Sequence, residues 1–328
     1  MPKIGYRTVK TAIGVAIAIY IAQFLGLRSF ASAGIITILC IQVTKKKSFK
    51  AAFSRFFACM IAMFYSSIFF EGIAFNPVVI GLMLLFFIPT VVAFKVQEGI
   101  VTSSVIILHI YSAGYVTLDL LLNETALLVI GISVALLMNM YMPSMENDLK
   151  KYQQNIENHF STIFQKMALY IRTGESNWDG KEIILVSDMI AQAKSLAFRD
   201  VENHVTRNDD FYYFYFKMRE KQFEIIERMM PLVASISPSS PYSRLIADFI
   251  DDLSVHIHPY NTSHIYLKKL EEMLERVRGM DLPKTREEFD NQVAMMDTIK
   301  ELEKYLVLKS VYKGFSRKKQ RMKKKTFA

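Results

Sequence analysis

The sequence predicts an all-α protein in which six transmembrane helices are followed by a cytoplasmic helical bundle. Six strongly apolar stretches without Asp, Glu, Lys or Arg lie within the first 145 residues, and the remaining 183 residues contain none. Beyond Pro143, apolar residues instead recur every three or four positions, which is the period of an amphipathic helix rather than of a strand. The chain is therefore expected to divide into a membrane half and a water-facing half.

The six apolar stretches have about the length of membrane-crossing helices. A helix needs roughly 20 mostly apolar residues, at about 1.5 Å each, to cross the hydrocarbon core. The shorter stretches reach this length when basic side chains at their ends extend to the lipid head groups, as Lys10 and Arg55 can. The stretches cover residues 11–27, 29–44, 56–70, 72–94, 99–118 and 125–145.

Basic residues alternate between the two sides of these spans. The segments before the first span and after the second, fourth and sixth carry nearly all of them, whereas the other connections hold Arg28 and three acids. This distribution predicts a multi-pass protein of the plasma membrane with both termini in the cytoplasm. The basic residues on the predicted inner side are Lys3, Arg7, Lys10, Lys45, Lys46, Lys47, Lys50, Arg55, Lys95, Lys150 and Lys151.

Two features of the membrane half modify this simple arrangement. The basic, amphipathic connection at 45–55 is expected to lie along the inner leaflet before the third span begins. Pro89 lies deep in the fourth span and is expected to kink it, because proline cannot donate a helical hydrogen bond.

The second half reads as amphipathic helices separated by Gly, Pro and Asn. We predict a transmembrane domain at 1–144, a cytoplasmic α-helical domain at 145–312 and a basic C-terminal tail at 313–328. The tail holds eight basic residues and no acid, so attraction to anionic lipid or simple solvation is favoured over binding to nucleic acid. The predicted helices cover about 145–173, 181–206, 209–230, 241–256, 262–279 and 285–312.

Ionisable groups at membrane depth are costly, so each is a candidate functional residue. His109 is the candidate for proton coupling, because a free imidazole titrates close to physiological pH. The alternative is a neutral imidazole bonded to a neighbouring helix, and Glu98 equally fits an interfacial residue paired with Lys95. At 100° per residue, four polar residues fall on one face of the fifth span over roughly 20 Å: Glu98, Thr102, His109 and Ser112.

A basic cluster follows the second span, and we name it the basic collar. It would raise the local concentration of an anionic substrate on the cytoplasmic side. An equally good interpretation is that it only determines topology. The basic collar consists of Lys45, Lys46, Lys47, Lys50 and Arg55.

Motifs of soluble enzymes are missing from the sequence. It contains no Walker phosphate loop, dinucleotide glycine pattern, cysteine pair or nucleophile elbow. Cys40 and Cys59 fall inside predicted spans, where they pack as small apolar residues. His256, His258 and His264 lie around a predicted helix end and loop, which does not favour a metal site. We therefore predict a protein that is not an enzyme and that needs no cofactor and no metal.

The first two spans, KIGYRTVKTAIGVAIAIYIAQFLGL (Lys3–Leu27) and SAGIITILCIQVTKKKSFKAAFSRF (Ser32–Phe56), resemble the aromatic acid exporter family of fusaric-acid-resistance-like transporters. The helical remainder resembles the C-terminal domain of the shorter bacterial members. The resemblance implies export of small aromatic carboxylates across the lipid bilayer, driven by the proton gradient. Longer relatives repeat the unit, so the single copy here implies a homo-oligomer of two or more chains.

A function of another class remains open from the sequence. The chain would then be a non-transporting membrane scaffold or stress sensor that acts through its cytoplasmic helical domain. The large size of that domain favours this hypothesis, whereas the polar face of the fifth span opposes it.

Overall fold

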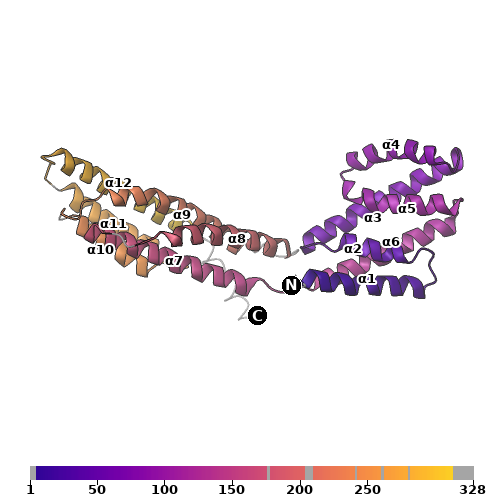
Figure 1. Ribbon diagram of the computed structural model, residues 1–328, viewed down its shortest axis with the longest axis horizontal. Coiled ribbons are helices and arrows are strands. Elements are labelled where there is room, and N and C mark those ends of the chain that lie inside the picture. The colour runs from indigo at the N-terminus through magenta and orange to yellow at the C-terminus, as the bar shows by residue number, and fades with distance from the viewer. Residues whose placement is uncertain are drawn as a thin grey trace. The chain divides into compact units, whose positions relative to one another are not determined.

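The protein is described by a computed structural model for residues 5–175, 178–203, 210–240, 242–259, 262–279 and 281–312. Across these ranges it consists of twelve α-helices and one short 3-10 helix, with no strand, so the all-α prediction is confirmed (Figure 1). The chain forms two compact units, and Lys3 and the predicted tail at 313–328 lie outside the described residues. Unit 1 comprises Met1–Pro143 with Glu202–Arg207, and unit 2 comprises Ser144–Val201 with Asn208–Ala328.

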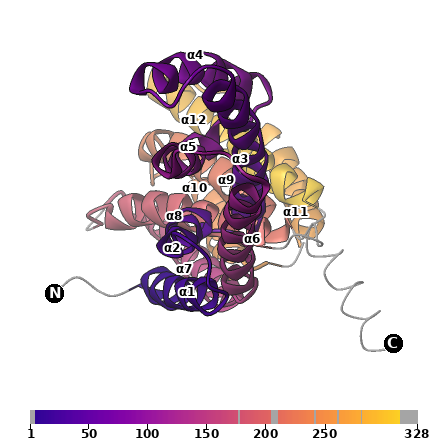
Figure 2. The ribbon, with the colours of Figure 1, turned by 90° about the vertical axis from the view of Figure 1, so that its right-hand side faces the viewer.

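Unit 1 contains six α-helices and the 3-10 helix η1. Helix α1 packs against α2 and α6, whereas α3 packs against α4, α5 and α6. Figures 1 and 2 show α1 and α4 at opposite edges of the unit. The elements are α1 (Tyr6–Phe24), α2 (Ala31–Cys40), α3 (Lys45–Gly72), α4 (Pro77–Ala93), η1 (Gln97–Gly99), α5 (Ile100–Ala113) and α6 (Leu118–Met140).

Local sequence explains where several of these helices begin and end. The side chains of Thr44, Asn76 and Thr117 each accept a hydrogen bond from a backbone N–H in the first turn of α3, α4 and α6. Such caps satisfy donors that have no partner inside the helix. Helix α5 ends at Gly114, whose φ of 75° is a left-handed conformation that glycine adopts without strain.

Small residues let the helices of unit 1 approach closely. A Cβ atom added to Gly131 of α6 would lie 2.7 Å from the Cβ of Ile36 in α2. One added to Gly99 would lie 2.4 Å from the Cβ of Ala58 in α3. Gly14 and Ala18 are likewise buried on the inner face of α1. Close backbone contact of this kind stabilises helix pairs in lipid, where apolar burial offers little driving force.

Two helices in the described part of the chain, α3 and α6, are long and apolar enough to cross a membrane by length and composition. Helices α2 and α4 are apolar but shorter, with 10 and 17 residues. Helix α1 begins with the charged side chains of Arg7 and Lys10, and α5 has only 14 residues. The count of six spans is therefore not confirmed and stays a prediction.

The predicted second span is only partly helical. Helix α2 ends at Cys40, and the chain runs through extended Ile41 and Thr44 into α3. The ten helical residues of α2 cover only about 15 Å, about half the thickness of the hydrocarbon core. Backbone outside a helix needs protein partners wherever lipid surrounds it. Ser48 supplies them, since its hydroxyl donates to the Cys40 carbonyl at 3.0 Å and accepts from the Gln42 N–H at 3.0 Å.

The connection at 45–55 is not separate from the third span, and its position along the inner leaflet stays a prediction. Residues 45–55 are the first turns of α3, which continues without a break to Gly72. The Thr44 cap starts the helix, and no proline or glycine interrupts it before its last residue. At 28 residues, α3 is about 42 Å long, so it exceeds the core thickness by about two turns.

Unit 2 consists of amphipathic helices around one apolar core. Helix α10 packs on α7, and α12 packs on α9 and α11. The predicted boundaries differ from those observed by a few residues. Helix α9 runs through Pro231 to Ala234, because a proline in the last turn removes few hydrogen bonds. The helices are α7 (Glu146–Thr173), α8 (Lys181–Asn203), α9 (Phe211–Ala234), α10 (Ser243–Val255), α11 (Ser263–Arg278) and α12 (Arg286–Val311).

Candidate functional site

His109 joins three helices of unit 1. Its Nδ1 lies 2.9 Å from Oε2 of Glu124 in α6, and its Nε2 lies 3.1 Å from the hydroxyl of Ser32 in α2. The side chain of His109 is 21% exposed and that of Glu124 only 2%. Both ring nitrogens therefore have a protein partner, while one part of the imidazole stays accessible. We name this group the His109 site.

The carboxylate of Glu124 is itself held in place. Asn123 donates from Nδ2 to Oε1 of Glu124 at 3.2 Å, and its amide also exchanges hydrogen bonds with the backbone of Arg28. The Arg28 side chain donates to the hydroxyl of Tyr115. These contacts attach the α1–α2 connection to the start of α6. Ser32, in the first turn of α2, is thereby positioned beside His109.

Chemically, the His109 site joins an imidazole to a carboxylate through a hydrogen bond. When His109 is neutral, the geometry fits an Nδ1–H that donates to Glu124 and an Nε2 that accepts from Ser32. When His109 is protonated, both nitrogens donate and the pair becomes an ion pair. A buried carboxylate is costly without a counter-charge, so the charge of the pair is coupled to the packing of α2, α5 and α6.

The predicted polar face of the fifth span is not one continuous row. Thr102 is buried and His109 is half-buried, but Glu98 and Ser112 are exposed. Glu98 lies in η1 rather than in α5, so the 100° rotation per residue does not carry through to it. Its carboxylate lies 3.5 Å from Nζ of Lys50, which replaces the expected partner Lys95.

The basic collar separates into two kinds of residue. Lys46, Lys47 and Lys50 are exposed on the first turns of α3, and Lys45 is half-buried. Arg55 is buried, and its Nη1 donates to the hydroxyl of Thr102 at 2.9 Å. Arg55 thus belongs to the interior of unit 1 and not to the collar.

Pro89 lies inside α4, which is helical on both sides of it. Its ring removes the N–H that would bond to the Leu85 carbonyl. The next residue, Thr90, donates its hydroxyl to the Phe86 carbonyl at 2.8 Å and lies 2.9 Å from the hydroxyl of Tyr65 in α3. The predicted kink stays a prediction.

The sequence reasoning missed Glu124 and the inward direction of Arg55, although a signal for both was present. Glu124 falls in the 3–4 residue repeat of Leu120, Leu127 and Gly131, all of which are buried in α6. Arg55 falls in the corresponding repeat of alanines on α3. Both residues flank predicted apolar spans, which begin just after Glu124 and Arg55 and so do not include them. The buried alanines of that repeat are Ala51, Ala58 and Ala62.

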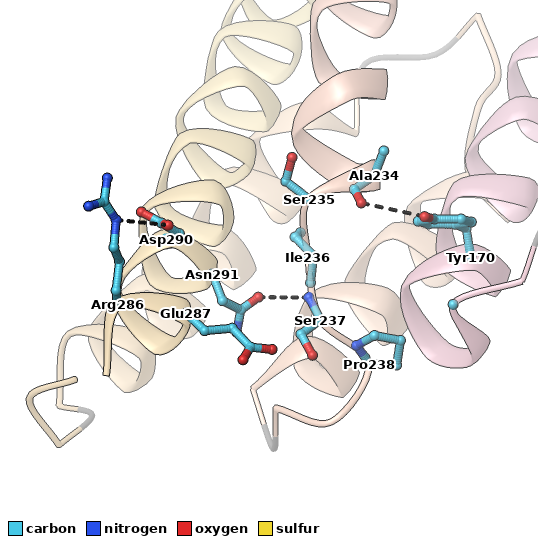
Figure 3. Close-up of a pocket in the computed structure, with 11 residues that line it drawn as sticks. Tyr170, Ala234, Ser235, Ile236, Ser237, Pro238, Arg286, Glu287, Asp290 and Asn291 are labelled. Carbon is cyan, nitrogen blue, oxygen red and sulfur yellow. Dashed lines mark hydrogen bonds and ion pairs between the residues drawn. The ribbon is translucent and has the colours of Figure 1, made fainter. Parts of the chain in front are cut away.

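Unit 2 contains an open pocket of about 610 Å³, shown in Figure 3. It lies between the end of α7, the loop after α9 and the start of α12. Its polar groups bond mainly to one another: Asn291 accepts from the Ser237 N–H at 2.8 Å, and Tyr170 donates to the Ala234 carbonyl at 3.4 Å. This pocket is a weaker candidate site than the His109 site, because its charged side chains, Arg286, Glu287 and Asp290, are all exposed.

Comparisons with known proteins cover nearly the whole chain. A family described as "Aromatic acid exporter family member 1" matches residues 2–142, and an aromatic acid exporter C-terminal domain matches residues 146–310. The chain is 53% identical to the uncharacterised protein YqjA of Bacillus subtilis, over 97% of this chain and 99% of that protein. A UPF0421 protein of Oceanobacillus iheyensis is 27% identical over 66% of this chain and 63% of its own length.

A solved structure of a membrane protein from Clostridium difficile 630 is 19% identical. It aligns with 49% of this chain and 95% of its own, with a TM-score of 0.44.

Proposed function

The chain belongs to the aromatic acid exporter family, and from that premise we propose that it exports small aromatic carboxylates in exchange for protons. Membership of this family makes it a membrane protein of an exporter class. The observation that supports proton exchange is the part-buried contact of 2.9 Å between His109 and Glu124, where three helices meet. Such a pair is costly inside an apolar unit and is common along proton pathways.

In the proposed cycle, the His109 site takes a proton from outside and releases it to the cytoplasm. Proton binding changes the charge of the His109–Glu124 pair, and this change alters how strongly α5 is held to α6 and α2. A ligand or proton shifts a conformational equilibrium only through a difference in binding between the two states. The hydrogen bonds of His109 to both Glu124 and Ser32 provide such a difference.

The exposed lysines of the basic collar attract the anionic substrate in this proposal. Lys46, Lys47 and Lys50 are exposed on α3, which the positive-inside pattern places at the cytoplasmic face. Their positive potential would raise the local concentration of a carboxylate before export. The proposal also includes assembly of two or more copies around a shared pathway.

Export is tested with right-side-out vesicles or whole cells loaded with labelled p-hydroxybenzoate. We expect wild-type protein to release the acid faster than empty membranes, and only when a proton gradient is present. His109→Ala and Glu124→Gln should abolish the gradient-dependent part, because each removes one member of the titratable pair. His264→Ala removes an exposed histidine of α11 in unit 2 and serves as the matched control.

Two results would contradict this function. Equal release by wild-type and empty membranes for every aromatic acid tested would exclude export and leave the scaffold or sensor hypothesis. If gradient-dependent export were unchanged in both His109→Ala and Glu124→Gln, the His109 site would not be the site of proton coupling.

A further inference from the structure

Unit 1 contains a buried arginine without an acidic partner. The Arg55 side chain has 7% relative exposure, and its one hydrogen bond within the described residues runs from Nη1 to Thr102 at 2.9 Å. Its Nε is buried and has no hydrogen-bond partner. No carboxylate oxygen of the described chain lies within 4.0 Å of the guanidinium. The acids of unit 1 that form ion pairs there use other residues: Glu98 pairs with Lys50, Glu124 with His109 and Glu202 with Lys47.

The charge of Arg55 cannot be removed by deprotonation, because a guanidinium keeps its proton in proteins. Burying a charge without a counter-charge is strongly unfavourable, above all in an apolar unit. The interior of unit 1 adds a second such cation, since Lys10 is buried and donates to the neutral amide of Asn139. Only one buried acid, Glu124, is found among the described residues of unit 1, and it is already paired with His109.

Packing keeps Arg55 in this position. Gly99, at the end of η1, presses against α3 so closely that a Cβ there would lie 3.1 Å from Cα of Arg55. The guanidinium is further tied to α5 through Thr102. On α3 it shares its buried face with Ala51 and Ala58, whose small side chains leave room for the long side chain of Arg55 between them.

We propose that Arg55, steadied by Thr102, binds the carboxylate of the exported aromatic acid inside unit 1. This inference rests on the proposed function and names the residue that recognises its substrate class. A guanidinium binds a carboxylate through two parallel N–H donors, and Nε offers one of them. The substrate would thus supply the counter-charge that the chain itself does not provide.

The test uses the full-length protein in nanodiscs of phosphatidylcholine, which carries no net charge. Thermal unfolding of unit 1 is followed with a thiol-reactive dye, because the only two cysteines, Cys40 and Cys59, are buried in this unit. The ligand is p-hydroxybenzoate, and the neutral p-hydroxybenzamide is its uncharged analogue. The variants are Arg55→Gln, Arg55→Lys and, as a matched loss of one positive charge, the exposed Lys95→Gln.

We expect p-hydroxybenzoate, and not the benzamide, to raise the unfolding temperature of wild type and Lys95→Gln. Arg55→Gln should weaken binding by about 10- to 100-fold, and Arg55→Lys should fall between, because it keeps the charge but loses the planar pair of donors. Without ligand, Arg55→Gln should unfold at the same or a higher temperature than wild type, since it removes an uncompensated charge.

Several outcomes would overturn the carboxylate site. They are a ligand response that survives in Arg55→Gln, the absence of any response to aromatic acids in wild type, and a lower unfolding temperature of ligand-free Arg55→Gln. Arg55-dependent stabilisation by added phosphatidylglycerol alone would make the counter-ion a lipid phosphate. Binding of the acid without export would contradict the proposed function but support the carboxylate site at Arg55. Export with an unchanged KM in Arg55→Gln would support the proposed function but contradict the carboxylate site.

Discussion

Units 1 and 2 each bury an arginine, and they treat it in opposite ways. In unit 2, Arg219 is fully buried and all three of its nitrogens donate: Nε to the hydroxyl of Tyr215 at 2.8 Å, Nη1 to Gln222 at 2.9 Å and Nη2 to Glu157 at 3.1 Å. In unit 1, Arg55 has one neutral partner and no carboxylate among the described residues. The comparison shows that this chain completes the ion pair of one buried arginine within its own core and leaves the other without a counter-charge in the described part.

The largest effect should come from breaking the completed pair in unit 2. Arg219→Met leaves the buried carboxylate of Glu157 without its counter-charge, so we expect a loss of about 3–5 kcal/mol in the free energy of unfolding. Urea unfolding followed by fluorescence of Trp178, the only tryptophan of the chain, reports on this unit because Trp178 packs against its core. If Arg55→Met reduced the free energy of unfolding of unit 1 by the same amount, the two buried arginines would contribute equally to stability, which would contradict the comparison.

Lys309, a buried lysine near Arg219, should make the stability of unit 2 depend on pH. Burial and the neighbouring Arg219 guanidinium lower its pKa from the ordinary 10.5 to about 7, and Glu157 opposes the shift. Between these values the unfolded chain binds more protons than the folded one, so the free energy of unfolding rises with pH. We expect Lys309→Met to stabilise unit 2 near pH 7 by on the order of 2–4 kcal/mol and to flatten this rise.

The check is Trp178-monitored urea unfolding of wild type and Lys309→Met at a series of pH values from 7 to about 10. Taking the difference between the two proteins cancels the titration of the other groups. Parallel curves for the two proteins would show that Lys309 does not titrate in this range.

Close backbone packing in unit 1 gives a smaller effect. Gly99→Ala places a Cβ at 2.4 Å from that of Ala58, so we expect a loss of about 1–3 kcal/mol from overpacking against α3. Gly81→Ala in α4 is the control, because no atom lies within 4 Å of its added Cβ. Thiol labelling of Cys40 and Cys59 during thermal unfolding measures both variants. Equal unfolding temperatures would show that α5 can shift away from Arg55 at little cost.

An arginine at the surface should matter least. Arg172 of α7 donates to Asp248 at 2.7 Å and to Asp251 at 3.0 Å, but its side chain is 35% exposed. We expect Arg172→Gln to reduce the free energy of unfolding by about 0.5–1 kcal/mol at low salt and by less at high salt. Trp178 fluorescence in urea at two salt concentrations checks this. A salt-independent loss above about 2 kcal/mol would place Arg172 with the buried pairs.

Local sequence was enough to predict the helices of unit 2 to within a few residues. The prediction of a helix from 285 matches α12, where Thr285 and Glu288 form a reciprocal cap. Helix α7 likewise begins soon after Pro143 and ends at Gly174, which adopts a left-handed conformation. These signals lie within one or two turns of the boundary that they define.

The sequence by itself determined that the chain is all-helical, that apolar helices precede amphipathic ones, and that His109 is a polar group of the apolar half. Only the tertiary structure decided that His109 meets Glu124, that Glu98 meets Lys50 and that Arg55 turns inward to Thr102. The reason is physical. Helical period defines which face a residue occupies, but the partner across the interface depends on the crossing and axial offset of two helices, and shifting one helix by a single turn exchanges every such pair.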